Sequence, residues 1–132
     1  MIRMVCPTCK KAAPDSMAYR CPDCGEPFEL EFEARFPIDK IRKRKANLWR
    51  YREAIPIESD EDIVSFEEGF TPLLKFDILG HPVWVKQDHL FPSGSYKDRG
   101  ASVLISYVRS MRIENVVEDS SGNAGCSIAM YA

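Results

Sequence analysis

Histidine is scarce in this chain of 132 residues, and neither of its two copies lies in a recognisable catalytic pattern. His81 and His89 have no serine, cysteine or carboxylate at a spacing typical of a nucleophile and its base. We expect both to be turn or surface residues, which is usual for histidine. The sequence therefore gives no support for a histidine-dependent nucleophilic site.

Long apolar runs and a strong net charge are missing too. No apolar run is long enough to cross a bilayer. The first residues lack the apolar core of a signal peptide, so we expect a cytoplasmic protein with reduced thiols. A formal net charge of −2 gives no global attraction to nucleic acid, and 45% hydrophobic residues are ordinary for a globular protein. The length suits one modest domain plus a small module.

Four of the five cysteines form two close pairs, Cys6-Pro7-Thr8-Cys9 and Cys21-Pro22-Asp23-Cys24. Each pair directs two thiolates at one point, and two pairs supply the tetrahedral sulfur set that Zn²⁺ prefers. We predict a zinc ribbon over residues 1–34, in which metal binding contributes most of the folding free energy. The rival interpretation, two redox dithiols, lacks the surrounding βαβ pattern. The predicted zinc ligands are Cys6, Cys9, Cys21 and Cys24.

Residues 35–67 are interpreted as a basic and aromatic arm followed by an acidic linker. The basic run 40–45 and the aromatic segment 48–52 are typical of surfaces that track phosphates, and zinc ribbons also bind nucleic acid or protein. The acidic residues of 58–68 balance this charge, and no reading helix is present. An interaction module is therefore the second function class, and we do not expect specific nucleic-acid binding.

A strand, a tight turn and a helix are predicted around Lys97. Residues 83–85 are apolar and β-prone, and the turn at 92–94 contains proline and glycine. Ser95 and Asp98 have capping-box spacing, and apolar residues recur at helical spacing from 101 to about Met111. Lys97 should lie in the first turn of this helix, where the helix end and the nearby Arg99 favour a free, nucleophilic amine. From local spacing alone, the default for such a lysine is a solvated surface charge.

The same order repeats further along the chain. Residues 114–119 are predicted to form a strand, and 120–125 turn into a helix that begins near Asn123. Strand, helix, strand, helix predicts a parallel sheet with right-handed crossovers, so the turns at 97 and 121 should face one pocket. The amides near Gly122 and Gly125, at a helix N-terminus, suit an anionic ligand such as a carboxylate.

Three stretches resemble motifs of the pyridoxal-phosphate-dependent enzymes of fold type II, and within them most resemble the threonine synthases. They are residues 88–100, residues 68–73 and residues 120–125, in the family's order and spacing. The resemblance implies an α/β fold, with 68–132 an incomplete catalytic domain. It also implies that Lys97 carries the cofactor, that Asn123 hydrogen-bonds the cofactor's phenolic oxygen and that one loop binds substrate. The implied substrate loop is Ser120, Ser121, Gly122, Asn123 and Ala124.

The activity implied by this resemblance is conversion of O-phosphohomoserine, an amino-acid substrate, to threonine and phosphate. Another β-replacing activity of the cysteate-synthase type is the alternative within the enzyme class. Ser93 and Tyr96 stand where the family commonly has threonine and phenylalanine. The family's catalytic region is longer than this chain, so we expect an amino-terminal piece that binds the cofactor weakly alone. A homo-oligomer or a second chain completing the domain is the expected partner.

Overall fold

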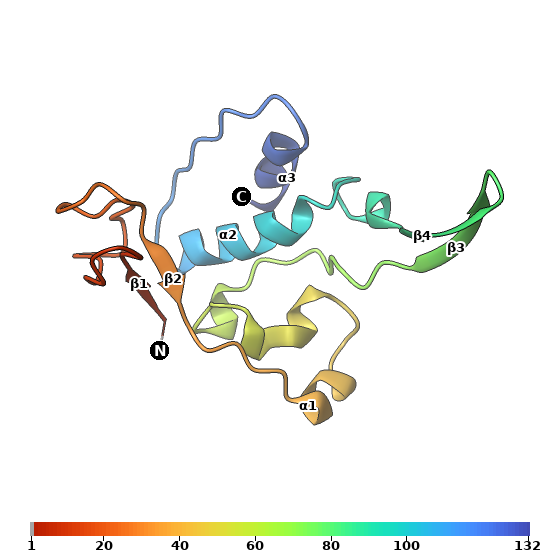
Figure 1. Ribbon diagram of the computed structural model, residues 1–132, viewed down its shortest axis with the longest axis horizontal. Helices are drawn as coiled ribbons and strands as arrows, with labels where there is room; N and C mark the ends of the chain where they lie inside the picture. The colour runs from red at the N-terminus through yellow and green to blue at the C-terminus, as the bar shows by residue number, and fades with distance from the viewer. Residues whose placement is uncertain (1) are drawn as a thin grey trace.

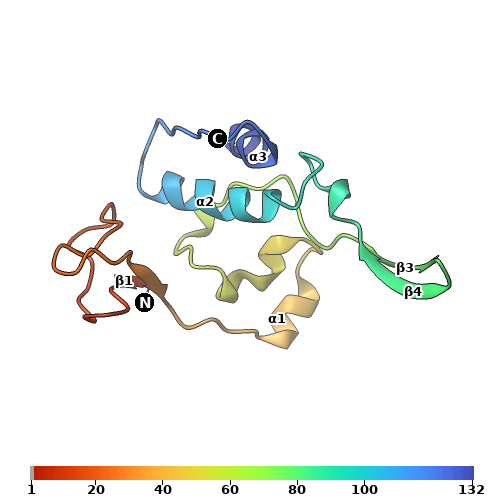
Figure 2. The same ribbon diagram turned by 45° about the horizontal axis from the view of Figure 1, so that its top comes forward.

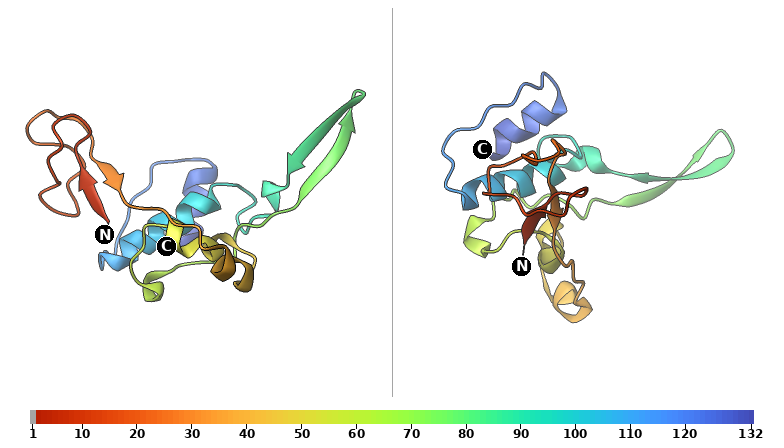
Figure 3. Two further views of the ribbon diagram at one scale, coloured as in Figure 1. Left: turned by 60° about the horizontal axis from the view of Figure 1, so that its bottom comes forward. Right: turned by 60° about the vertical axis from the view of Figure 1, so that its left-hand side comes forward.

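A single long helix is the centre of the structure, a computed structural model that describes residues 2–132. This helix, α2, runs from Asp98 to Ser110. The strand pair β1 (Arg3–Val5) and β2 (Glu29–Glu31) lies near one end of the molecule, and the hairpin of β3 (Leu73–Ile78) and β4 (His81–Lys86) projects from the other (Figure 1, Figure 3).

Shorter helices cover α2 on two sides. Helix α3 (Asn123–Tyr131) packs on α2 from one side and is seen almost end-on above it in Figure 2. On the other side of α2 lies the 3₁₀ segment Leu48–Ala54, and α1 (Ile38–Lys43) packs on that segment. Two further 3₁₀ turns are Asp60–Asp62 and Asp88–Leu90. No helix among residues 2–132 has both the length and the apolar character needed to cross a membrane.

The amino-terminal module has the predicted ribbon character. β1 and β2 are antiparallel, with Met4 opposite Leu30. Its buried core consists only of Cys6, Cys21 and Phe28, against which a few small or flexible apolar side chains pack. Such a core buries too little apolar area to hold the module without further cross-links or metal.

The β-prone residues 83–85 belong to β4, the second strand of a hairpin with a tight turn. β3 and β4 pair along six residues each, so His81 already belongs to β4 and the turn consists of Leu79 and Gly80. Both turn residues have positive φ, 55° and 78°, as in the two-residue turns that match strand twist. The Gly80 N–H donates to the Asp77 carboxylate at 2.9 Å, which closes the turn.

The predicted parallel sheet is not formed among residues 2–132, where both sheets are two-stranded and antiparallel. Residues 114–119 are not a strand, and Val117 is 97% exposed. The reason is the lack of a neighbouring strand, because β3 and β4 pair with each other and point away from the helices (Figure 1). Residues 64–66 form no strand either, and hydroxyls of α2 bind the Val64 backbone.

Helix α2 agrees with the prediction from its apolar spacing. It ends at Ser110, next to the expected Met111. Ala101 and Ile105 are buried against Tyr131 of α3. Leu104, another apolar residue of α2, is 49% exposed.

Candidate functional site

Lys97 lies immediately before α2, one position earlier than predicted. It is the residue that caps the helix, and its backbone N–H donates to the Ser95 hydroxyl at 3.3 Å. Its side chain is exposed, with Nζ 4.7 Å from the centroid of the Tyr96 ring. Tyr96, whose role the sequence left open, therefore contributes a cation–π contact to this amine. The amine is accessible to a small molecule approaching from solvent.

Arg99 is engaged elsewhere. Its Nη2 lies 3.2 Å from Asp88 Oδ1, and its guanidinium stacks 4.7 Å from the Phe91 ring centroid. The Thr71 hydroxyl also donates to Asp88. Partial burial acts to raise the pKa of Asp88, but the hydrogen bonds from Thr71 and Arg99 lower it overall. The charge of Arg99 is thus paired, and its expected influence on the Lys97 amine is weakened accordingly.

This pairing gives Thr71 a role that sequence reasoning did not find. Through Asp88, Thr71 joins the entry motif 68–73 to the motif 88–100. The two histidines are exposed, as predicted. They do not contribute to this network.

Glu68 is the buried centre of a second network. Only 1% of it is exposed, and its carboxylate accepts hydrogen bonds from Trp49 Nε1 at 3.0 Å, the Phe66 N–H at 2.9 Å and the Tyr131 hydroxyl at 2.9 Å. The Ser65 hydroxyl is a fourth donor. Burial and the Glu68 carboxylate raise the pKa of Tyr131 above its usual value. Sequence reasoning missed Glu68 because glutamate is normally a surface residue.

Trp49 confirms that the arm is a packing segment. Its side chain is 8% exposed, and Nε1 also donates to the Ser102 hydroxyl of α2 at 2.9 Å. The basic run before it is partly paired: Arg44 forms a bidentate pair with Glu53 at 2.6 and 2.7 Å. This hydrogen-bonded pair lowers the pKa of Glu53 to about 2. Lys45 and Arg52 pair with acidic residues as well.

The loop predicted to bind substrate leads directly into α3. Asn123 is the first residue of that helix and is exposed, as are Ser121 and Gly122. A Cβ at Gly125 would lie 2.3 Å from the Ser120 carbonyl oxygen, so only glycine fits at this close approach. Cys126, inside α3, is exposed.

The helix starts at 97 and 123 are joined through buried side chains. Ser127, one turn into α3, donates to Asp98, the first residue of α2, at 2.6 Å. The structure therefore brings together the two segments predicted to hold the cofactor. The common pocket expected between them remains a prediction, since Lys97 and Asn123 are both exposed.

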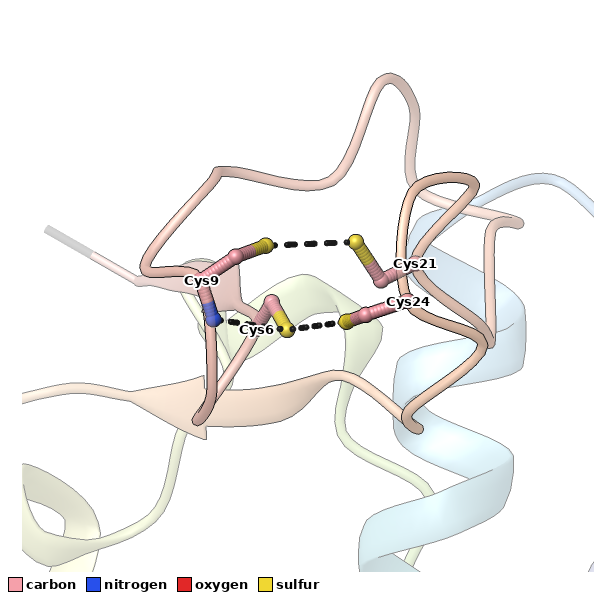
Figure 4. Close-up of side chains that lie close together, drawn as sticks. All are labelled: Cys6, Cys9, Cys21 and Cys24. Carbon is pink, nitrogen blue, oxygen red and sulfur yellow. Dashed lines mark hydrogen bonds between the residues drawn. The ribbon is translucent and has the colours of Figure 1, made fainter.

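The four ribbon cysteines converge on one point (Figure 4). The Sγ atoms lie within 4.8 Å of one another, with Cys6 to Cys24 and Cys9 to Cys21 both at 3.4 Å. A tetrahedral zinc site with Zn–S bonds of about 2.3 Å has sulfur separations of roughly 3.8 Å, so the cluster has the size of such a site. A hydrogen bond from the Cys9 N–H lowers the pKa of Cys6 to about 7, whereas the neighbouring thiols raise the pKa of Cys24 and of Cys9.

Comparison with known proteins identifies the class. The family model described as "Pyridoxal-phosphate dependent enzyme" matches residues 64–132, and the chain belongs to this family. Among curated proteins, the chain is similar to the threonine synthase of Methanocaldococcus jannaschii, with 34% identity over 128 residues that cover 89% of this chain and 31% of the relative.

Two further relatives have the same name. The threonine synthase of Methanosarcina acetivorans is 27% identical over 125 residues, covering 89% of this chain and 30% of the relative. That of Synechocystis is 34% identical over 88 residues, 62% of this chain and 23% of the relative. The chain thus spans about a third of the length of the first two relatives. No solved structure matches significantly.

Proposed function

We propose that this chain contributes the cofactor lysine and the cofactor loop of a threonine-synthase-type lyase, which converts O-phosphohomoserine to threonine and phosphate. The observation that carries the proposal is the accessible amine of Lys97 at the start of α2, joined through Asp98 and Ser127 to the helix that begins at Asn123. These groups fit pyridoxal phosphate, because the amine is free to meet an aldehyde and the amide side chain lies at the neighbouring helix start.

Each residue has a distinct role in this proposal. Lys97 would hold the cofactor, and its amine would carry protons between carbons of the substrate. Asn123 orients the cofactor through a hydrogen bond to its phenolic oxygen. Residues 120–124 present backbone N–H groups to the substrate carboxylate at the start of α3. Bound pyridoxal phosphate supplies the electron sink.

The ribbon has a structural role in the proposal. One Zn²⁺ bound by Cys6, Cys9, Cys21 and Cys24 stabilises a module whose own apolar core is very small. The protein acts in the cytoplasm on an amino-acid substrate. The expected partner is a second copy of the protein in a homo-oligomer.

A β-replacing enzyme of the cysteate-synthase type is the alternative within this class, because the cofactor groups would be the same. The interaction-module alternative is disfavoured by the buried Trp49 and by the ion pairs of the basic run, such as Arg44 with Glu53. Those pairs reduce the charge available to phosphates.

A chimera tests the function. This chain replaces the matching part of the Methanocaldococcus jannaschii relative, and borohydride trapping at Lys97 is measured with pyridoxal phosphate. Phosphate release from O-phosphohomoserine is measured in parallel, with Lys97→Ala as the control. We expect trapping and turnover, both lost in the control. A folded chimera that traps the cofactor at another lysine, or that traps it at Lys97 and turns over only a different substrate, would contradict the proposal.

A further inference from the structure

Asp98 is a fully buried acidic residue directly beside the exposed Lys97. Its exposed fraction is 0%, although aspartate is normally a surface residue. Oδ2 accepts the backbone N–H of Ser93 at 2.8 Å, and Oδ1 accepts the hydroxyls of Ser93 and, at 2.6 Å, Ser127. Three donors and the N-terminal end of α2 thus stabilise the carboxylate without an ion pair among residues 2–132.

The three donors come from segments that are far apart in the sequence. Ser93 lies in the turn that leads to Lys97, and Ser127 lies 29 residues after Asp98, in α3. Because Ser127 is four residues after Asn123, both lie on the same side of the first turns of α3. Displacing Asp98 therefore shifts the Lys97 turn relative to the Asn123 helix start.

We propose that Asp98 is a positioning residue that holds the Lys97 turn and the start of α3 as one unit. This inference rests on the proposed function, in which the Lys97 amine and the Asn123 amide contact the same cofactor and must keep a fixed separation. Asp98 does not touch the cofactor in this arrangement. It acts through Ser93 and Ser127.

Amide hydrogen exchange of the 132-residue chain tests the link without cofactor or turnover. Removing one hydrogen bond to a charged group by Ser127→Ala should raise exchange roughly tenfold at the Ser93 N–H and in the first turn of α3. Exchange in the ribbon, for example at the Cys21 N–H bonded to Glu26, should change less than about twofold. The control is Ser110→Ala, whose hydroxyl bonds only within α2, to the Tyr107 carbonyl.

A conservative variant separates positioning from simple loss of stability. In Asp98→Asn, the amide oxygen accepts the Ser93 N–H while the amide nitrogen donates to two hydroxyls that reverse, so all three links survive. In Asp98→Asn, the exchange rates at the Ser93 N–H and in the first turn of α3 should stay within about threefold of those in the parent chain. Asp98→Ala breaks all three links, so its increase in exchange at these amides should be at least as large as that in Ser127→Ala.

Several results overturn the inference. In the parent chain, an unprotected Ser93 N–H would do so. In Ser127→Ala, an unchanged exchange rate at the Ser93 N–H would do so, as would a rate increase spread equally over the ribbon. In Asp98→Asn, a loss of protection as large as that in Ser127→Ala would do so. In the chimera, Ser127→Ala should slow borohydride-trappable linkage at Lys97 roughly tenfold, with little change in binding of pyridoxine 5′-phosphate, which lacks the aldehyde. An unchanged linkage rate also overturns it. No trapping in the parent chimera defeats the proposed function alone, because exchange still decides the link.

Discussion

Glu68→Gln should destabilise the fold strongly for a change of one atom. Each carboxylate oxygen faces an N–H that cannot reverse: Oε1 faces Trp49 Nε1, and Oε2 faces the Phe66 backbone. Whichever position the amide nitrogen takes, it opposes one of these donors. Trp49 retains the Ser102 hydroxyl as a second acceptor, so we expect the amide nitrogen on that side.

The size of the effect follows from the buried hydrogen bonds that are lost. A buried hydrogen bond left unmade costs about 1–3 kcal/mol, and bonds to a charged group lie at the upper end. A loss of roughly 2 kcal/mol lowers the melting temperature of a chain of this size by about 6–10 °C. The assay is thermal unfolding followed by circular dichroism at fixed pH and zinc concentration.

Glu67→Gln is the matched control for this substitution. Glu67 is adjacent and pairs with Lys45 at the surface, with 54% of its side chain exposed. An exposed pair of this kind contributes about 0–1 kcal/mol, so the melting temperature should fall by only a few degrees. If Glu68→Gln and Glu67→Gln had the same melting temperature, the assignment of Glu68 as a buried hydrogen-bond centre would be refuted.

Four other predictions concern metal, charge and cofactor. Metal analysis of the purified chain should find one Zn²⁺ per chain, and a zinc-free chain with a folded ribbon would contradict the assignment. A nucleic-acid titration at moderate salt should show no sequence-selective binding by residues 40–52. Arg44 lowers the pKa of Glu53 from 4.5 to about 2. The stabilisation from this pair is therefore fully present above about pH 4.5 and is lost as the pH falls towards 2. Glu53→Gln should remove that part of the pH dependence of the melting temperature. The chain alone should not trap pyridoxal phosphate stoichiometrically at Lys97, and stoichiometric trapping with turnover would show that it needs no partner.

Local patterns predicted the parts of the fold that depend on neighbouring residues. The cysteine spacing predicted the cluster, the apolar periodicity predicted α2, and the β-prone residues 83–85 predicted part of β4. The predicted parallel sheet is absent because strand pairing depends on distant partners, and residues 114–119 have none among residues 2–132. Glu68 and Asp98 were missed as buried groups for the same reason, since their donors lie up to 63 residues away.

The polar residues of α2 explain how distant segments set the position of Lys97. Ser102 and Ser106 are fully buried and hydrogen-bond to the backbone of Val64, in the segment that leads into the entry motif. The Ser102 hydroxyl also accepts a hydrogen bond from Trp49 of the arm. Asp98 binds α3 in the same way. Because buried polar groups cost free energy unless they are paired, each contact resists displacement of α2. The amine at the start of this helix is thus held by segments from the arm to the last helix, and substitutions far from residue 97 should alter its position.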